Sequence, residues 1–426
     1  MSFLRKLAFW SIAIVFPLPL VVLFETESRD PDRLKNIIVL GLVAYCWWLL
    51  AVLLSARPGW LDRWVGLPAV YGLHGMLGVL ALVLAYIHSQ NSYAPNALAR
   101  DLGEWALYGS FGLLCFSVFF LSGWLVDRSR LVSRVKSLLE KVVRRQLSVW
   151  VHRLNLLVLA AIWLHAHLLG RVSEHFAFMV LFDFYTVAVL GVYIWKKWIS
   201  PDGYLTGTVR SNIARGDTTR VVTVVLDRPD PRIRPGDFFF LRFERRKVIG
   251  KEWHPFSVTG DSQKELTFTI RQHGDYTRKI GDVEVGTRVR LEGSFGRFES
   301  IVQELDDSTP LVLLGMGAGI APLLSLAAAH HKRRPIELLW SVRRPDDPYY
   351  GDVLDEFVQG SGGRMRVTTR VGRFRKEHLS AALSPEAVEK GAVFVVGPNP
   401  AVLASRSTLR RVGVSRKRVH DERLTM

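Results

Sequence analysis

The amino-acid sequence predicts three domains: a bundle of six transmembrane helices, an antiparallel β-barrel that binds a flavin, and an α/β nucleotide-binding domain with a parallel sheet. Three observations predict this order. Six long apolar stretches fill the first 195 residues, short alternating strands follow Pro201, and apolar strands alternate with helices from Ser308 onward. At roughly 150 residues per domain, 426 residues also suggest about three units. We place the domains at 1–198, 199–304 and 305–426.

Composition excludes several classes of protein. Hydrophobic residues make up 49% of the chain, with 13 Trp and 23 Phe, which is too apolar for a disordered chain. The only two cysteines, Cys46 and Cys115, lie in apolar runs, which excludes a disulfide scaffold, a cysteine-ligated zinc site and an iron–sulfur cluster. The net charge of +17 fits a cytoplasmic membrane face better than nucleic acid, because no basic helix with interleaved aromatic residues lies outside the membrane-flanking segments.

Each apolar stretch is long enough to cross about 30 Å of hydrocarbon. The stretches lie near residues 7–24, 36–55, 67–88, 106–125, 147–170 and 176–194. A cleaved signal peptide is the alternative for the first, but no A-x-A-like site follows it, and we expect it to be retained. Segment 126–146 carries seven Lys or Arg residues, and Lys196 and Lys197 follow the sixth stretch. The positive-inside bias therefore places these segments and both termini on the cytoplasmic side of a plasma (inner) membrane.

Four histidines inside these stretches form two pairs. His74 and His88 are 14 residues apart in the third stretch, and His152 and His165 are 13 apart in the fifth. Each pair is therefore separated along its helix by about 20 Å. Ionisable residues are costly in hydrocarbon, and a haem held between one imidazole of each helix at each of two levels would satisfy the ring nitrogens. The alternative reading of each histidine is an interhelical hydrogen bond.

Helix geometry leaves the outer ligand of the fifth stretch open. At 100° per residue, 14 residues return to within about 40° of the same face, whereas 13 residues miss it by about 140°. His167, which is 15 residues from His152, misses by only about 60°. An ideal helix therefore favours His167, and His165 needs a tilt or a local irregularity.

Residues 253–257 read Trp-His-Pro-Phe-Ser, and a strand then leads to the segment IRQHGDYTRKI. A flavin domain needs an aromatic residue against the ring, a hydroxyl near N5, and a cation and a helix N-terminus for the pyrophosphate. Phe256 would supply the first and Ser257, the predicted catalytic residue, the second. Arg271 would contact phosphate. The other predicted flavin contacts are His254, Pro255, Gly274, Asp275, Tyr276 and Thr277.

A glycine-rich turn after the strand PLVLL predicts a nicotinamide site. It holds Gly315, Gly317, Gly319 and Pro322, and its glycines would let the backbone approach a dinucleotide pyrophosphate. A second turn, Gly397-Pro398, ends a later strand.

The next strand after the glycine-rich turn ends at Arg343 and Arg344. These arginines would bind a ribose 2′-phosphate, which favours NADPH over NADH. As solvated surface charges they would carry no such meaning, and the sequence leaves both readings open.

Together these motifs resemble the ferric reductase and NADPH oxidase family of transmembrane flavocytochromes over nearly the whole chain. The family has six spans, two bis-histidyl b haems, an HPF[ST] motif, a GD-aromatic-T motif and a GxGxGxxP turn. The phrase VWVHRLNLLVLAAIWLH is similar to the family's fifth span, which makes His165 the implied ligand together with His74, His88 and His152. Three positions depart from the family. Val396 stands where oxidase members often carry Cys, and Leu424 stands where an aromatic residue usually ends the chain. Ser92 stands where some eukaryotic oxidases carry a further His.

The resemblance implies an oxidoreductase that moves electrons from cytoplasmic NAD(P)H through FAD and two b-type haems to an extracytoplasmic acceptor. The acceptor would be O2, giving superoxide, or Fe(III). We expect a lipid bilayer around the helices, no nucleic acid and no obligate protein partner. The alternatives are a haem-free flavin reductase anchored by its helices, and a haem-sensing or transport protein with a degenerate reductase domain.

Overall fold

A computed structural model describes residues 3–121, 135–136, 138–139, 145–199, 204–216, 218–244, 249–250, 252–260, 262–272, 274–344 and 350–423. The chain divides into two compact units, Met1–Pro201 and Asp202–Met426, and each is described by itself. Most of the predicted basic segment 126–146, and Leu424, lie outside the described residues.

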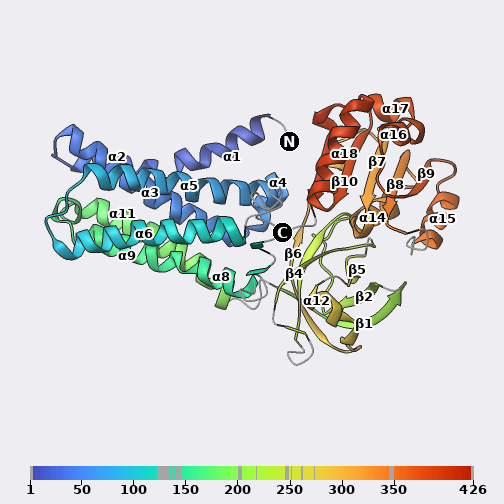
Figure 1. The fold of residues 1–426 in the computed structure, drawn as a ribbon, viewed down its shortest axis with the longest axis horizontal. Helices are drawn as coiled ribbons and strands as arrows, with labels where there is room; N and C mark the ends of the chain where they lie inside the picture. The colour runs from blue at the N-terminus through green and yellow to red at the C-terminus, as the bar shows by residue number, and fades with distance from the viewer. Residues whose placement is uncertain are drawn as a thin grey trace. The chain divides into compact units, whose positions relative to one another are not determined.

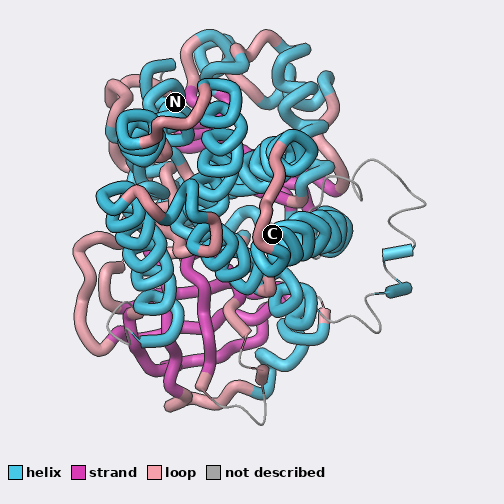
Figure 2. The backbone as a smooth tube through the Cα atoms, turned by 90° about the vertical axis from the view of Figure 1, so that its left-hand side faces the viewer, coloured by secondary structure: helices cyan, strands magenta, loops and turns pink. Residues whose placement is uncertain are grey.

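The first unit is helical (Figures 1 and 2). Its helices are α1 (Phe3–Val15), α2 (Leu18–Glu27), α3 (Asp32–Ser55), α4 (Gly59–Val65), α5 (Leu67–Asn91), α6 (Ala97–Phe120), α8 (Arg145–Arg153), α9 (Asn155–His167), α10 (Gly170–Ser173) and α11 (Phe176–Ile194), which continues as the π-helix η1 (Trp195–Ile199).

Six helical segments of this unit are long and apolar enough to cross a membrane, judged by length and composition. They are Leu7–Glu27, Asp32–Ser55, Leu67–Asn91, Ala97–Phe120, Leu147–His167 and Phe176–Ile199. The fourth begins nine residues before the predicted stretch, because its first two turns are polar. Asn96 caps that start, since its side chain accepts a hydrogen bond of 3.2 Å from the Ala99 N–H.

The fifth segment is interrupted between α8 and α9 at Leu154. The Leu154 N–H bonds the Val151 carbonyl at 3.0 Å, and the Leu157 N–H bonds the Leu154 carbonyl at 2.9 Å. These bonds reach back three residues instead of four, which tightens the turn. The Asn155 side-chain amide donates a hydrogen bond of 2.7 Å to the His152 carbonyl. The fifth segment is therefore not the ideal helix on which the angular argument rested.

Packing in this unit pairs α5 with α3 and α9 with α6, while direct contact between α5 and α9 is slight. Buried apolar side chains of α2, α3, α9 and α11 form one core, around Phe24, Tyr45 and Phe178. A second core, around Phe9, Leu50 and Leu73, joins α1, α3, α4 and α5.

The second unit begins with a six-stranded antiparallel sheet. Its strands are β1 (Leu205–Arg215), β2 (Thr219–Leu226), β3 (Phe238–Phe243), β4 (His254–Ser257), β5 (Glu265–Arg271) and β6 (Arg288–Phe295), in the order β4-β3-β6-β1-β2-β5. The predicted barrel does not close, because β4 and β5 remain edge strands joined through the single bridge Val258↔Phe268. The strand β4 is only four residues long. The short helices α12 (Asp275–Arg278) and η3 (Lys279–Asp282) follow β5.

A five-stranded parallel sheet completes this unit. Its strands are β7 (Leu311–Met316), β8 (Ile336–Val342), β9 (Met365–Val371), β10 (Ala392–Gly397) and β11 (Val419–Arg423), in the order β11-β10-β7-β8-β9. The helical elements are α13 (Phe298–Gln303), η4 (Gly317–Ile320), α14 (Ala321–His330), α15 (Gly351–Gly360), α16 (Lys376–Ala382), α17 (Pro385–Glu389), α18 (Asn399–Val412) and η5 (Arg416–Arg418).

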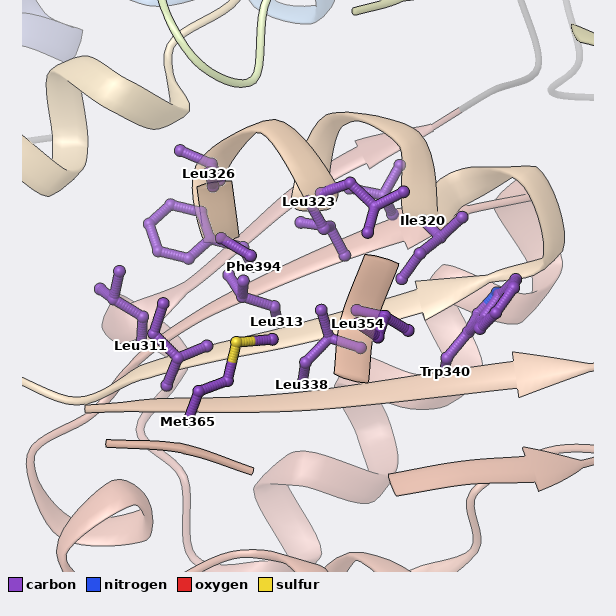
Figure 3. Packing of buried hydrophobic residues seen from close by; sticks show 14 of the residues in the cluster. Leu311, Leu313, Ile320, Leu323, Leu326, Leu338, Trp340, Leu354, Met365 and Phe394 are labelled. Carbon is purple, nitrogen blue, oxygen red and sulfur yellow. The ribbon is translucent and has the colours of Figure 1, made fainter. Parts of the chain in front are cut away.

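Both faces of the parallel sheet are buried. Leu313 and Leu338 meet Leu323 of α14 on one face (Figure 3), and Val312 and Leu339 belong to the core on the other. Strand order reverses between β7 and β10. In sheets of this kind ligands bind at the carboxyl ends of the strands beside such a reversal.

Three polar interactions tie the domains of the two sheets together. The Gly236 N–H donates to Ser325 Oγ at 2.6 Å, Arg215 Nη1 lies 3.1 Å from Asp352 Oδ2, and the Thr269 and Tyr350 hydroxyls are hydrogen-bonded. The antiparallel and parallel sheets therefore form one compact unit.

Candidate functional site

The four predicted metal-ligating histidines are each anchored through Nδ1. In α5, His74 Nδ1 lies 2.9 Å from the Ala51 carbonyl and His88 Nδ1 lies 2.8 Å from the Ile37 carbonyl, both in α3. A carbonyl can only accept, so Nδ1 carries the proton in both rings.

The same arrangement holds on the fifth segment. His165 Nδ1 lies 2.6 Å from the Ala99 carbonyl, and His152 Nδ1 lies 2.8 Å from Ser117 Oγ, both acceptors being in α6. The Nε2 atoms of all four histidines have no hydrogen-bond partner among the described residues. Four half-buried imidazoles thus keep their second nitrogen available as a ligand.

The rings of one predicted histidine pair, His74 and His152, lie in contact. The ring centroids of His74 and His152 are 5.8 Å apart. Two imidazoles on opposite sides of one metal ion need centroids about 6 Å apart, since each metal–nitrogen bond is about 2 Å long.

His167 differs from His165 because both of its nitrogens are occupied. Its Nδ1 lies 2.9 Å from the Trp163 carbonyl, and its Nε2 lies 3.3 Å from Asp183 Oδ1 of α11. The Trp163 indole also donates to Asp183, at 2.7 Å. His167 therefore belongs to a polar cluster with α11 and is separate from the paired histidines.

The HPFS segment, His254–Ser257, forms the edge strand β4 and pairs with β3. Ser257 is buried, with 8% of its surface exposed, and its hydroxyl has no hydrogen-bond partner in the described part of the chain. Phe256 packs against the apolar core of the antiparallel sheet. Pro255 lies between them in the strand, where its missing N–H is tolerated because β4 is an edge.

The GDYT segment meets the HPFS segment through two rings. Tyr276 stacks on His254, with centroids 3.7 Å apart and planes at 24°, and His254 Nε2 lies 3.0 Å from Glu252. The Tyr276 hydroxyl is buried and has no hydrogen-bond partner among the described residues. Burial raises the pKa of Tyr276, so the hydroxyl keeps its proton as a donor. An orphaned buried donor of this kind fits a polar ligand at this place.

Gly274, Asp275 and Thr277 surround that tyrosine. Gly274 has a φ of +91°, and a Cβ there would meet nothing within 4 Å, so the backbone borders open space. Asp275 begins α12 and pairs with Arg278 at 3.3 Å. This turn exposes backbone beside the stacked rings.

The glycine-rich turn contains glycines with different roles. A Cβ at Gly315 would lie 3.0 Å from Ile320 Cα, and one at Gly319 would collide with the Val396 carbonyl. These two glycines let η4 pack against β7 and β10. Gly317 instead has a φ of +58° and borders open space except for Arg271 Nη1, 3.5 Å from a Cβ built there. Packing thus explains the glycines at 315 and 319, whereas Gly317 borders open space, and the approach of a ligand to this turn stays a prediction for all three.

The predicted phosphate-binding residues of the two sheets converge at this turn. Arg271 ends β5 of the antiparallel sheet and reaches Gly317 of the parallel sheet. Gly397 ends β10 next to β7, where a Cβ would lie 2.8 Å from Met316 Cβ, and Pro398 precedes α18. Pro322 lies in the first turn of α14, as predicted from its fixed φ.

Arg343 and Arg344 follow β8, one strand further along the sheet, and both are exposed. They therefore lie at the carboxyl edge of the parallel sheet, two strands from Gly397.

The structure adds three residues that sequence reasoning missed: Gly41, Gly103 and Ser117. A Cβ at Gly41 would lie 3.0 Å from His88 Nδ1, and one at Gly103 would lie 3.1 Å from His165 Cε1. Ser117 contacts His152. The 14-residue interval between Gly103 and Ser117 repeats the His74–His88 interval and is the sequence pattern that relates them.

Comparison with known proteins concerns the second unit. A family model described as an FAD-binding domain matches residues 209–294. The chain is 27% identical over 201 residues to the reductase component of propane 2-monooxygenase from Mycolicibacterium smegmatis, covering 41% of this chain and 56% of that protein. It is 26% identical over 210 residues to the ferredoxin reductase component of 3-ketosteroid-9-alpha-monooxygenase from Mycobacterium tuberculosis, covering 46% and 56%. The chain thus spans about half the length of these relatives.

Among solved structures, the cytochrome P450 reductase GcoB of Amycolatopsis is similar, with 24% identity and a TM-score of 0.47 over 52% of this chain and 70% of that one. Residues 209–294 therefore match an FAD-binding domain, within the part of the chain where the sequence predicted a flavin-binding domain.

Proposed function

We propose that this chain, with its FAD-binding reductase domain, is a transmembrane oxidoreductase that passes electrons from NAD(P)H through FAD and two b-type haems to an acceptor across the membrane. O2, giving superoxide, and Fe(III) are the acceptors that we expect. The plasma (inner) membrane is the proposed location, with both termini and the reductase half in the cytoplasm.

One observation carries this proposal: His74, His88, His152 and His165 are all anchored by Nδ1, and none of their Nε2 atoms has a hydrogen-bond partner within the described part of the chain. Interhelical hydrogen bonds alone do not explain this uniformity. Histidines that only join helices by hydrogen bonds would have no reason to leave the same ring nitrogen without a partner. Metal-ligating histidines, in contrast, donate their other N–H to a carbonyl or hydroxyl, which fixes the tautomer. The separation of His74 and His152 supports a shared metal ion.

In this assignment His74 with His152 holds the inner haem and His88 with His165 the outer haem. A haem held by two histidines would supply single-electron transfer and would leave no position for a substrate. The carbonyls of α3 and α6 hold the rings in place before the cofactor binds. The occupied nitrogens of His167 support His165 as the outer ligand.

The residues of β4 and α12 fit an FAD. FAD, when bound, accepts a hydride and gives up electrons one at a time. Phe256 would pack on the ring, the buried Ser257 hydroxyl would donate toward N5, and the orphaned Tyr276 hydroxyl would donate to the cofactor. Arg271 and the Gly274 turn would bind the pyrophosphate.

The strand ends beside Gly317 and Gly397 are the proposed NAD(P)H site, because they lie where the strand order reverses. Arg271 reaches this turn from the flavin sheet, so the nucleotide and flavin sites share a border. Arg343 and Arg344, at the edge of the same sheet, would bind a 2′-phosphate, and we therefore expect a preference for NADPH.

The test is an anaerobic titration of purified full-length protein, reconstituted with haem and FAD in detergent, with NADPH. We expect the bands of reduced b-type haem to develop, with two haems per chain by pyridine haemochromogen assay. Haem that stays oxidised while FAD is reduced would contradict the proposal. With O2 or an Fe(III) chelate as acceptor, a signal sensitive to superoxide dismutase identifies an oxidase, and an insensitive one a ferric reductase.

A haem-free reductase is the second candidate, because the relatives named above are reductase components of multicomponent oxygenases. In that case the helices would only anchor the flavin domain. Its expected signature is NADPH-dependent reduction of an artificial acceptor by protein that contains FAD and no haem after reconstitution.

A further inference from the structure

The anchors of the four histidines repeat at one interval. In α3 the two accepting carbonyls, Ile37 and Ala51, are 14 residues apart, which is the spacing of His74 and His88. In α6, Ala99 and Leu113 are again 14 apart: the Ala99 carbonyl accepts from His165, and the Leu113 carbonyl accepts from Ser117, the partner of His152. The helices α3 and α6 therefore provide anchors at the same two levels.

The residue four positions after each carbonyl differs between the levels. It is glycine at the outer level, Gly41 and Gly103, and serine at the inner level, Ser55 and Ser117. Four residues are about one helical turn, so this side chain covers the carbonyl that precedes it. At the outer level the absence of a side chain admits the imidazole, since a Cβ would lie 3.0–3.1 Å from His88 or His165.

Ser117 stands between its histidine and the carbonyl. Its hydroxyl lies 2.6 Å from the Leu113 carbonyl and 2.8 Å from His152 Nδ1. A serine has one proton, and the carbonyl can only accept it, so the Ser117 oxygen must accept from the Nδ1–H of His152. The Nε2 lone pair of His152 is thereby left for a ligand. Ser55, in contrast, donates to the Val52 carbonyl at 2.7 Å, and His74 bonds its carbonyl directly.

We propose that Ser117 is a positioning residue that fixes the tautomer and ring orientation of His152 and tunes the inner iron site. The assignment rests on the proposed function and goes beyond it. Of the four paired histidines, three are anchored by main-chain carbonyls and only His152 by a side chain. A partner that accepts the Nδ1 proton raises the basicity of the ligand, and the bond from Ser117 to Leu113 polarises the hydroxyl further. The inner site is thus the one that a single substitution can retune.

The experiment compares full-length Ser117→Ala, Ser117→Gly and Ser117→Thr with wild type, each purified and reconstituted with haem and FAD. Ser110 provides the matched control, because it lies in the same helix and its hydroxyl bonds only the Leu107 carbonyl, at 2.9 Å. The measurements are haem per chain, electron paramagnetic resonance of the low-spin ferric haems, and an anaerobic redox titration. FAD content reports on folding in every variant.

We expect Ser117→Ala to weaken haem retention at one site by about 10- to 100-fold. The haem that remains there should show altered g-values and a raised midpoint potential, because the ferric state loses ligand basicity, while the other haem is unchanged. Ser117→Thr keeps the hydroxyl and should match wild type. Ser117→Gly opens the Leu113 carbonyl to His152, as at the outer level, and should restore most of the haem lost in Ser117→Ala.

Ser117→Ala that matches Ser110→Ala in haem content, g-values and potentials would overturn the assignment while leaving the proposed function intact. Equal loss in the alanine, glycine and threonine variants would also overturn it, since that result indicates a packing role. Wild-type protein without haem after reconstitution would overturn the proposed function and this inference with it.

Discussion

At the residue scale, His165 and His167 show how two neighbouring histidines acquire different roles. His165 faces α6 and uses one ring nitrogen to bond the Ala99 carbonyl. His167 faces α11, and its two ring nitrogens contact the Trp163 carbonyl and the Asp183 carboxylate. We expect His165→Ala to lose one of two haems and His167→Ala to keep both, measured by haemochromogen assay. Two haems in the His165 variant would refute our choice of ligand.

The orphaned Tyr276 hydroxyl gives a second prediction. Because Tyr276→Phe keeps the ring stacked on His254 and removes only the donor, FAD affinity should fall about 2- to 10-fold, the cost of one hydrogen bond. Fluorescence titration of FAD into flavin-stripped protein measures it. The exposed Tyr93, changed likewise, serves as control. An unchanged affinity would show that the hydroxyl does not meet the cofactor.

The pairing of the histidines could be predicted from the sequence because the intervals of 14 residues (His74 to His88) and 13 residues (His152 to His165) each lie within one apolar stretch. Ser117, Gly41 and Gly103 could not be predicted as neighbours of these rings, since they lie on other helices and their role arises only from packing. The residue types did not indicate this role either, because a glycine or a serine is ordinary in an apolar helix.

At the scale of elements, the glycine-rich turn separates packing from binding. Gly319→Ala forces a Cβ into the Val396 carbonyl, and we expect a loss of about 1–3 kcal/mol in the free energy of unfolding, as for overpacked cores. Gly317→Ala strains a left-handed residue by about 1–2 kcal/mol and fills the space beside Arg271.

The two variants should therefore differ in kind. The melting temperature of the reductase half should fall further in Gly319→Ala than in Gly317→Ala. The KM for NADPH should rise further in Gly317→Ala than in Gly319→Ala. Equal effects on both quantities in both variants would contradict the distinction.

Elements were predictable where one sequence period sufficed and less so where two segments had to meet. The strands of both sheets and the order of helix and strand follow from apolar periodicity. The start of α6 was missed because polar residues occupy its first turns, and the break at Leu154 leaves no proline or glycine as a marker. The open edge between β4 and β5 is a feature that alternation alone does not fix.

At the scale of the whole molecule, the stability of the reductase unit should depend on pH through His420. This histidine lies on β11 against Phe394, and burial lowers the pKa of His420. The unfolded chain therefore binds this proton near pH 6.5, where the folded chain does not, so the free energy of unfolding should fall as pH drops below that value.

We expect His420→Gln to lose less of its melting temperature between pH 7.5 and 5.5 than wild type does, measured by calorimetry of the full-length protein. The half-exposed His378, changed to Gln, provides the comparison. If wild type and His420→Gln lose the same amount, the imidazole is not the group that titrates.

Helix α3 carries the carbonyl partners of both α5 histidines, so the distance between these two carbonyls sets the axial spacing of the imidazoles. Fourteen residues make nearly four complete turns, which keeps both carbonyls on one side of α3. Inserting or deleting one residue between Ile37 and Ala51 would rotate one of the two carbonyls by about 100° away from its imidazole. The length of this stretch of α3 is therefore as constrained as the identity of the histidines it serves.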